Sequence, residues 1–243
     1  MYKRQTLLRQ AIDRLDGLVP RQNIFILTNH LQEAEVRRQA HDIPVDNIIS
    51  EPVRRDTAPA IALGIGLIKA ADPHGVMLVI PSDQLIQDQE SFRTLMKAAM
   101  DTAAREKALV TVGIKPTWPC PSYGYIERGE EIQSVPGCSC REVIQFREKP
   151  DTATAASYLS RGNFCWNAGM FVWSIPAVCE QLDKHCPELA SFVEHVAESP
   201  APQETIREEF PALTPISIDF ALMEHADKLY MTQSALSKRI KAL

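Results

Sequence analysis

An aspartate, Asp83, follows closely on the apolar run at residues 76–80. Five consecutive apolar residues bounded by Gly75 and Pro81 predict a strand buried on both faces, as in the middle of a parallel sheet. Ligands of open α/β sheets bind outside the carboxyl ends of the strands, where phosphates and metal ions are handled. Asp83 is therefore the first candidate functional residue. The alternative, that Ser82 or Asp83 merely caps the following segment, stays open.

A basic loop, residues 50–56, precedes a nearly all-apolar helix predicted over 60–71. Asp56 or Thr57 can cap this helix, and Pro59 suits its first turn. The N-terminal amides of a helix, together with two neighbouring arginines, form a site for an anion or a nucleotide. A solvated basic turn is the simpler interpretation when the loop is considered alone.

Three further positions could contact a small polar ligand. Gly124, between two tyrosines, would let a ligand approach the backbone, or it could mark a strand kink. Glu148 and Lys149 end a predicted strand and could hold a sugar hydroxyl and a sugar phosphate, or form a surface ion pair. Asn167 could hydrogen-bond two hydroxyls or satisfy a turn.

Alternating strand and helix patterns would position these residues, which predicts an α/β protein. The patterns predict helices over 6–15, 31–40, 60–71, 90–107, 151–161, 175–197 and 218–225, and strands over 23–29, 48–49, 76–80, 109–114, 143–150 and 164–173. A hairpin with its turn at Pro136-Gly137 is predicted over 130–141, and a proline-containing linker with a short helix over 199–215. The first strand expected of the βαβ rhythm is missing.

The composition is that of a globular protein, with 45% apolar and 23% charged residues. A net charge of −5 provides no overall basic field for nucleic acid. No stretch has the length of a membrane span or the order of a signal peptide, so a cytoplasmic location without a membrane partner is expected. Cys138 and Cys140 could offer two thiolates to zinc, but six dispersed cysteines are more simply free thiols.

The order of several motifs is more specific than any one of them. E-P-x-x-R-D-T-A-P-A, V-I-P-S-D, G-I-K-P-T with Y-G-Y-I, F-R-E-K-P, W-N-A-G-M-F and S-I-D-F-A-L-M-E follow one another over residues 6–230. This series resembles the bacterial mannose-1-phosphate guanylyltransferases, within the sugar-nucleotide pyrophosphorylases. The resemblance implies a nucleotide-diphospho-sugar transferase fold, a Rossmann-like mixed sheet flanked by helices. It also implies that GTP and mannose 1-phosphate give GDP-mannose and pyrophosphate, with Mg²⁺ as the cofactor.

The same resemblance implies roles for individual residues. Asp83 would be a catalytic residue and a ligand of Mg²⁺, and Lys149 a catalytic residue beside the sugar phosphate. The sugar hydroxyls would contact Gly124, Glu148 and Asn167. The nucleotide would contact Glu51, Pro52, Arg55, Asp56, Thr57, Pro81 and Ser82.

The sequence also departs from the family pattern at both ends. It lacks the opening strand and glycine-rich loop, G-G-x-G-x-R-L-x-P-L-S, and the later W-x-D-V-G-S-W segment that holds a second metal ligand. Residues 1–230 are therefore expected to form an N-terminally truncated nucleotidyltransferase domain. Residues 231–243 are expected to be an unrelated tail that resembles the recognition helix of LysR-type transcription regulators.

These departures predict that the chain has lost nearly all transfer activity. Two alternatives are a nucleotidyltransferase for another hexose 1-phosphate and a non-catalytic fragment that binds a nucleotide or sugar phosphate. A DNA-binding regulator has only the tail in its favour. Assembly into a homo-oligomer is left open.

Overall fold

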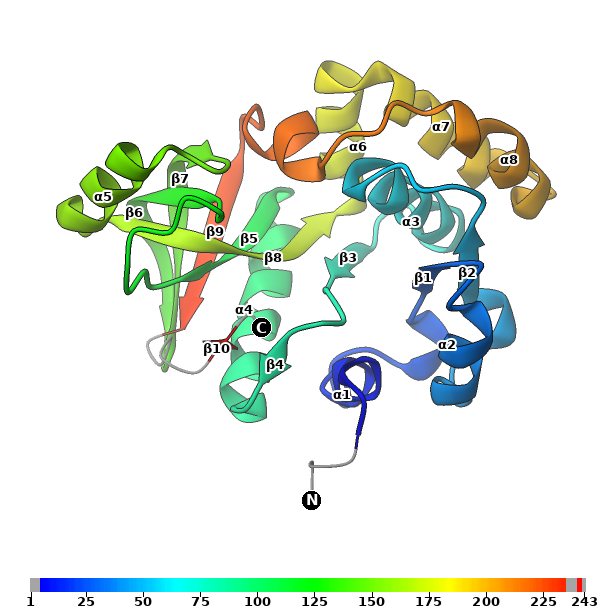
Figure 1. Ribbon diagram of the computed structural model, residues 1–243, viewed down its shortest axis with the longest axis horizontal. Helices are drawn as coiled ribbons and strands as arrows, with labels where there is room; N and C mark the ends of the chain where they lie inside the picture. The colour runs from blue at the N-terminus through cyan, green and yellow to red at the C-terminus, as the bar shows by residue number, and fades with distance from the viewer. Residues whose placement is uncertain (1–4, 235–239, 242–243) are drawn as a thin grey trace.

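The computed structural model describes residues 5–234 and 240–241 and has helices on both faces of a mixed β-sheet (Figure 1). The helices are α1 (Leu7–Asp13), α2 (Glu33–Gln39), α3 (Thr57–Ala71), α4 (Gln89–Glu106), α5 (Thr152–Arg161), α6 (Ile175–His185), α7 (Pro187–Glu198) and α8 (Pro202–Glu209). Short 3₁₀ turns are η1 (Arg21–Asn23), η2 (Val45–Asn47) and η3 (Phe210–Ala212), and η4 (Asp219–Met223) is a π-helix. The strands are β1 (Ile26–Asn29), β2 (Ile48–Glu51), β3 (Val76–Val79), β4 (Leu85–Ile86), β5 (Leu109–Ile114), β6 (Tyr125–Val135), β7 (Cys138–Arg147), β8 (Phe164–Ser174), β9 (Leu229–Ser234) and β10 (Ile240–Lys241). The predicted mixed α/β fold is confirmed.

Local sequence signals account for most element boundaries. Asp56 caps α3 and Asp151 caps α5, each by accepting a hydrogen bond from a backbone N–H of the first turn. Gly162 ends α5 in the left-handed conformation that favours glycine. The predicted hairpin turn joins β6 to β7, although both strands extend further than predicted.

Strand β8 organises the six-stranded sheet. It pairs antiparallel with β3, β5 and β6, and the order of the sheet is β3-β8-β5-β9-β7-β6. Because β6 returns to pair with β8, five strands form a closed ring beside β3. An eleven-residue strand that is apolar at nearly every position suits this place, since both its faces are covered.

The position predicted for β3 is wrong. The strand is half-buried and lies at the edge of the sheet, antiparallel to β8, instead of in the middle of a parallel sheet. The two preceding strands, β1 and β2, do not extend this sheet, because they pair with each other in a separate parallel sheet. Among the described strands, β3 therefore has β8 as its single neighbour.

Strand β9 places four residues of the expected tail inside the domain. It lies between β5 and β7, parallel to β5, and the side chains of Met231 and Thr232 are fully buried. Residues 231–234, which resemble the start of a recognition helix in sequence, are therefore part of a strand in this structure. The remainder of the LysR-like segment, apart from the short strand β10, lies outside the described residues.

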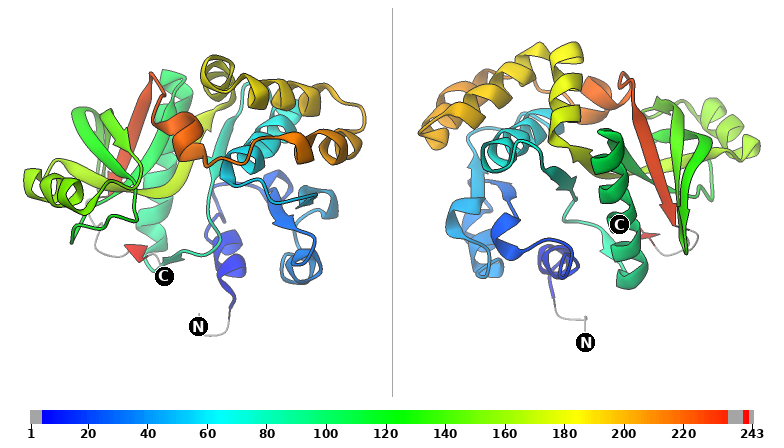
Figure 2. Two further views of the ribbon diagram at one scale, coloured as in Figure 1. Left: turned by 45° about the horizontal axis from the view of Figure 1, so that its top comes forward. Right: turned by 180° about the vertical axis from the view of Figure 1, so that it is seen from behind.

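Helices cover the sheet from two sides (Figure 2). Helix α4 packs its apolar side on one face, whereas α3, α6 and α7 share the larger core on the other. Helices α3 and α7 approach closely at Gly66, where a Cβ atom would lie 2.8 Å from Cβ of Val196. The glycine thus allows the contact between the two helices.

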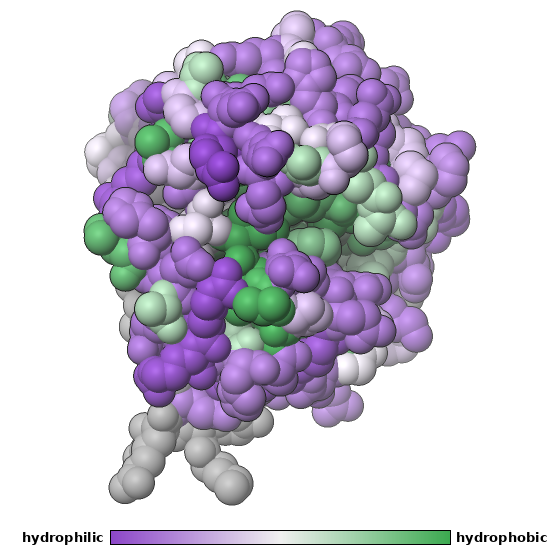
Figure 3. Space-filling view, turned by 90° about the vertical axis from the view of Figure 1, so that its right-hand side faces the viewer, coloured by the Kyte–Doolittle hydropathy of each residue, from purple (hydrophilic) through white to green (hydrophobic). Residues whose placement is uncertain are grey.

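The face of the molecule on the side of α2 and α8 is largely hydrophilic (Figure 3). Seen from the side of α2 and α8, apolar residues gather in a hollow across the middle of that face (Figure 3). In the part of the chain that the structure describes, no helix combines the length and apolar character needed to cross a membrane.

The approach at Gly66 yields a stability prediction. Gly66→Ala should unfold at lower urea concentration than Gly64→Ala, by about 1–3 kcal/mol in the free energy of unfolding, because the new methyl group meets the β-branched Val196. Gly64→Ala is the matched control: it gains the same helix propensity, about 1 kcal/mol, and faces the flexible end of Met77. Equal unfolding midpoints would contradict the proposed close packing.

Candidate functional site

Three of the predicted ligand contacts converge at the end of the β6–β7 hairpin. The Asn167 backbone N–H donates to the Gly124 carbonyl at 2.8 Å. A Cβ atom on Gly124 would lie 2.5 Å from Oε2 of Glu148 and 3.3 Å from Cβ of Asn167. A larger residue at this position would therefore displace the Glu148 carboxylate.

The Asn167 carboxamide is held in one orientation by its neighbours. Its Oδ1 accepts hydrogen bonds from the Thr111 hydroxyl at 2.9 Å and from the Gly169 backbone N–H at 3.1 Å. Its Nδ2 donates to Oδ1 of Asp219 at 2.9 Å. One hydrogen of Nδ2 remains after these contacts, because an amide nitrogen carries two.

The motif S-I-D-F-A-L-M-E contributes two residues, Asp219 and Glu224, that had no role assigned from the sequence. Asp219 contacts Asn167 as described, and Glu224 accepts a hydrogen bond from the Glu148 backbone N–H at 2.8 Å. Asp219 begins η4 and Glu224 follows it, and η4 is a π-helix where an ordinary helix over 218–225 was predicted. The difference follows from the Glu224 N–H, which bonds the Asp219 carbonyl five residues back.

Burial next to other carboxylates disfavours the ionised form of Asp219. Desolvation and the nearby Glu148 raise the pKa of Asp219 to about 7, with a smaller contribution from Asp56, whereas Lys149 opposes the shift. Glu148 itself is nearly buried, at 8% side-chain exposure, and its partner Lys149 is 57% exposed with 3.2 Å between Nζ and Oε1. The predicted ion pair of these two residues is present, and its lysine faces outward.

The predicted nucleotide loop is tied to the same motif. The Thr57 hydroxyl accepts a hydrogen bond from the Ile218 backbone N–H at 2.9 Å, and the Ala58 N–H donates to the Ile216 carbonyl at 3.0 Å. Asp56, the N-cap of α3, has φ 66° and ψ −172°, a conformation that is strained for any residue except glycine. Backbone strain of this kind persists where the surroundings fix it, here the contact with residues 216–218.

Other predicted nucleotide contacts are engaged differently. Arg55 donates from Nε to the Pro211 carbonyl at 3.0 Å, so its guanidinium already binds the protein. Burial raises the pKa of Glu51 at the end of β2. Pro52 is half-buried beside it. The contacts of these residues with a nucleotide stay predictions.

The turn with Pro81, Ser82 and Asp83 follows β3 and is fixed against β8. Gln84 donates to the Ala168 carbonyl at 2.6 Å, and a Cβ atom on Gly169 would lie 3.8 Å from Pro81. Asp83 is exposed and, within residues 5–234, has no recorded hydrogen bond or ion pair. The turn is therefore tied to Ala168, the residue that follows Asn167 in the sequence. The carboxylate of Asp83 is free to bind a ligand.

Asp83 fits a role as one ligand of Mg²⁺. No group of three or more His, Cys, Asp or Glu side chains that could hold a metal occurs among the described residues. Mg²⁺ needs no such group, because it commonly binds one or two carboxylates together with substrate phosphates and water. Zinc at Cys138 and Cys140 does require further ligands, and both thiols are free and buried against α4.

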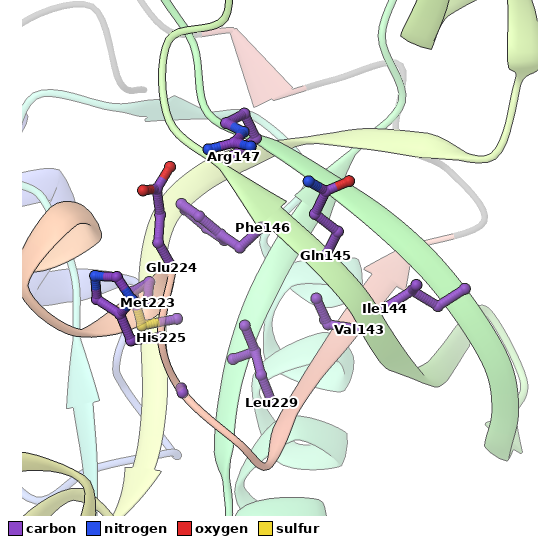
Figure 4. Close-up of a pocket in the computed structure, with 10 residues that line it drawn as sticks. Val143, Ile144, Gln145, Phe146, Arg147, Met223, Glu224, His225 and Leu229 are labelled. Carbon is purple, nitrogen blue, oxygen red and sulfur yellow. The ribbon is translucent and has the colours of Figure 1, made fainter. Parts of the chain in front are cut away.

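A cavity of about 260 Å³ lies beside these residues, between β7 and the segment after η4 (Figure 4). It is lined by Val143, Ile144, Gln145, Phe146, Arg147, Met223, Glu224, His225, Ala226 and Leu229. Glu224 is the residue that it shares with the hydrogen-bonded network. The residues predicted to contact the ligand do not line this cavity. The candidate site is therefore defined by the cluster of Gly124, Glu148 and Asn167.

Known proteins resemble the chain over most of its length. A family model described as nucleotidyl transferase matches residues 1–210. The mannose-1-phosphate guanylyltransferase of Escherichia coli K12 is 36% identical over 95% of this chain and 50% of its own length. That of Sinorhizobium fredii is 36% identical over 90% of this chain and 43% of its own. The chain thus spans about half the length of the curated relatives it matches.

Two solved structures share the fold. A Thermus thermophilus protein described as mannose-1-phosphate geranyltransferase superposes with a TM-score of 0.82, at 28% identity over 99% of this chain and 66% of its own. A Helicobacter pylori protein described as mannose-6-phosphate isomerase gives a TM-score of 0.76, at 26% identity over 97% of this chain and 90% of its own.

The raised pKa of Asp219 yields a prediction for stability against pH. The folded state binds a proton that the unfolded state, with a pKa near 3.8, has already released, so stability should fall as pH rises from about 4 to 7 and level off above. The full shift corresponds to roughly 4 kcal/mol, at about 1.4 kcal/mol per pKa unit. Asp219→Asn should abolish the decrease in the free energy of unfolding that is due to Asp219. Urea unfolding of the wild type and the variant at pH 5 and pH 8 measures this decrease.

The two pH values separate this effect from a general loss of packing. A variant that is destabilised equally at both would contradict the assignment of the proton to Asp219. Asp101→Asn, at an exposed position of α4, is the matched control and should follow the wild-type curve.

Proposed function

The chain belongs to the nucleotidyl transferase family, and from this premise we propose that it binds GTP and mannose 1-phosphate as a mannose-1-phosphate guanylyltransferase. The observation that carries the proposal is the convergence of Gly124, Glu148 and Asn167 on one polar cluster beside Lys149. The names of the curated relatives support the choice of mannose and guanine. The reaction would release pyrophosphate and form GDP-mannose.

The proposed sugar contacts complement a hexose. Hydroxyl groups both donate and accept hydrogen bonds, so a carboxylate and an amide N–H in one cluster match them. The nearly buried Glu148 would accept from hydroxyls, and the remaining hydrogen of the Asn167 amide would donate to another. Lys149, exposed at the rim, would pair with the phosphate of the sugar.

The proposed nucleotide contacts lie on the loop before α3 and on the turn after β3. The loop at residues 51–57 leads into the N-terminus of α3, where the helix dipole favours a negatively charged group. Pro81 and Ser82 would contact the nucleotide from the turn. Positioning of this kind suffices for much of the chemistry, because the sugar phosphate is itself the nucleophile that attacks phosphorus in line.

We propose Asp83 as a ligand of Mg²⁺. When bound, the ion would neutralise negative charge on the phosphates of the nucleotide. The free, exposed carboxylate supports this role, as does its place in a turn that Gln84 ties to β8 next to Asn167. Asp83 would supply one carboxylate ligand, and substrate phosphates and water would complete the coordination of the ion.

Thermal unfolding with added ligand tests the proposed function. With Mg²⁺ present, GDP-mannose and GTP should raise the midpoint of unfolding, because a ligand that binds the folded state stabilises it by mass action. UTP and UDP-glucose serve as controls and should produce a smaller shift. A larger shift with the uridine nucleotides would favour a nucleotidyltransferase of different specificity.

A substitution of the proposed phosphate partner makes a separate prediction. Lys149→Met should weaken mannose 1-phosphate at least about tenfold in calorimetric titration, because it removes a charge-assisted contact. Lys97→Met, at an exposed position of α4, should leave the affinity unchanged. Equal affinities of the two variants would rule out Lys149 as the phosphate contact.

A further inference from the structure

Asp219 is held at the centre of the polar cluster although the fold gains little from its charge. The side chain that donates to it within the described chain is Asn167, at 2.9 Å, and an uncharged amide would accept that hydrogen bond equally well. The carboxylate is partly buried beside Glu148, and Asp56 adds a second negative charge nearby. A charge that is desolvated among like charges disfavours folding. Groups retained at such a cost are typical of functional sites.

The backbone around Asp219 is irregular as well. Asp219 is the first residue of the π-helix η4, and π-helical turns occur frequently at functional sites. The preceding residues, 216–218, hold the strained N-cap loop of α3 through two hydrogen bonds. The carboxyl group is thus fixed from two directions, by its backbone and by Asn167.

We propose that Asp219 is a further sugar-binding residue, which in its neutral form donates a hydrogen bond from Oδ2 to a ligand oxygen while Glu148 accepts one. This inference rests on the proposed function, because the ligand is the hexose part of a sugar phosphate or nucleotide sugar. It assigns Asp219 a role that differs from that of the other carboxylates at the site.

The hydrogen bond from Asn167 is compatible with the neutral form, and burial and the neighbouring charges favour that form. Oδ1 of Asp219 accepts from Asn167, as the carbonyl oxygen of a carboxylic acid does, which leaves Oδ2 to carry the proton. The groups that face Asp219 are Glu148 and Lys149 after β7, Asp56 before α3, and the uncharged Asn167 of β8. Glu148 and Asp56 favour protonation and Lys149 opposes it. An incoming phosphate pairs with Lys149 and so reduces that opposition.

A neutral Asp219 beside an ionised Glu148 complements the hydroxyl groups of a sugar. Two carboxylates would both accept hydrogen bonds, and neighbouring sugar hydroxyls would have to supply every proton. One acid and one carboxylate instead offer a donor and an acceptor to adjacent oxygens of a hexose. The pKa of about 7 places the change of state within the range of ordinary buffers.

The test is the affinity for GDP-mannose and for GDP, measured by calorimetry from pH 6 to pH 8 with Mg²⁺. GDP-mannose has no terminal phosphate and does not titrate in this range. The affinity of the wild-type chain for GDP-mannose should decrease by up to about tenfold from pH 6 to pH 8. The reason is that, above the pKa of an acid, its neutral fraction decreases about tenfold per pH unit. The loss should exceed that for GDP, which lacks the sugar.

Asp219→Asn is the decisive variant because its amide imitates the neutral acid. Its carbonyl accepts from Asn167 and its NH₂ group donates to the ligand, so GDP-mannose affinity should stay close to the wild-type value at pH 6 and become independent of pH. Asp219→Ala should weaken GDP-mannose at all pH values, by about tenfold or more, with GDP unchanged. Asp101→Asn should match the wild type.

The outcomes separate the two proposals. If the wild-type chain binds GDP but gains nothing from the sugar, the proposed function fails at the sugar site. If the sugar contributes to affinity but the wild type and Asp219→Asn show the same pH dependence, the inference on Asp219 alone is overturned. The wild-type pH profile is a test that needs no variant, so a folding defect in either variant does not remove it.

Discussion

The hydrogen bond from Asn167 to Asp219 joins the two parts of the chain that build the polar cluster. Asn167 belongs to β8, which pairs with three strands, and Asp219 opens the π-helix that precedes β9. Thr111 of β5 and Gly169 fix the other end of the amide. Because the carboxamide makes these contacts, the positions of Gly124 and Glu148 follow from the sheet and do not depend on a ligand. The cluster is preorganised in the sense that its side chains are already oriented.

The segment at residues 211–219 extends this order to the opposite side. Its Pro211 carbonyl accepts a hydrogen bond from the Arg55 guanidinium, and its residues 216–218 form hydrogen bonds with Thr57 and Ala58. The same segment contains Asp219. The loop before α3 and the hairpin end are therefore positioned by one short stretch of chain. A change in this stretch would be transmitted to both proposed halves of the site, the nucleotide contacts and the sugar contacts.

Signals within a few residues made the helices and strands predictable. Features that depend on contacts between residues far apart in the sequence could not be predicted in this way. Caps, prolines and apolar periodicity located α4 to within one residue at each end and β5 to the residue, whereas α3 begins three residues earlier than predicted. Gly124, Glu148 and Asn167, which the order of motifs assigned to one ligand, lie together in the structure. The edge position of β3 and the inclusion of β9 depend on which strands pair, and local pattern carries no such information. Arg55 finds its partner 156 residues away, and the pKa of Asp219 is raised by burial and shifted further by charged residues from two other segments.

The place of β9 in the sheet has a consequence for biosynthesis. Among the strands of the six-stranded sheet, β9 is the last in sequence, yet it lies between β5 and β7. A ribosome delivers β5, β6, β7 and β8 first, and domains begin to fold as they emerge. These strands must then wait with an open slot in their middle, whose exposed edges are templates for pairing with other chains. The insertion of β9 is thus a late step that joins segments far apart in the sequence, and such pairings form slowly. Until it occurs, the open edges of β5 and β7 have to be kept from pairing with other chains.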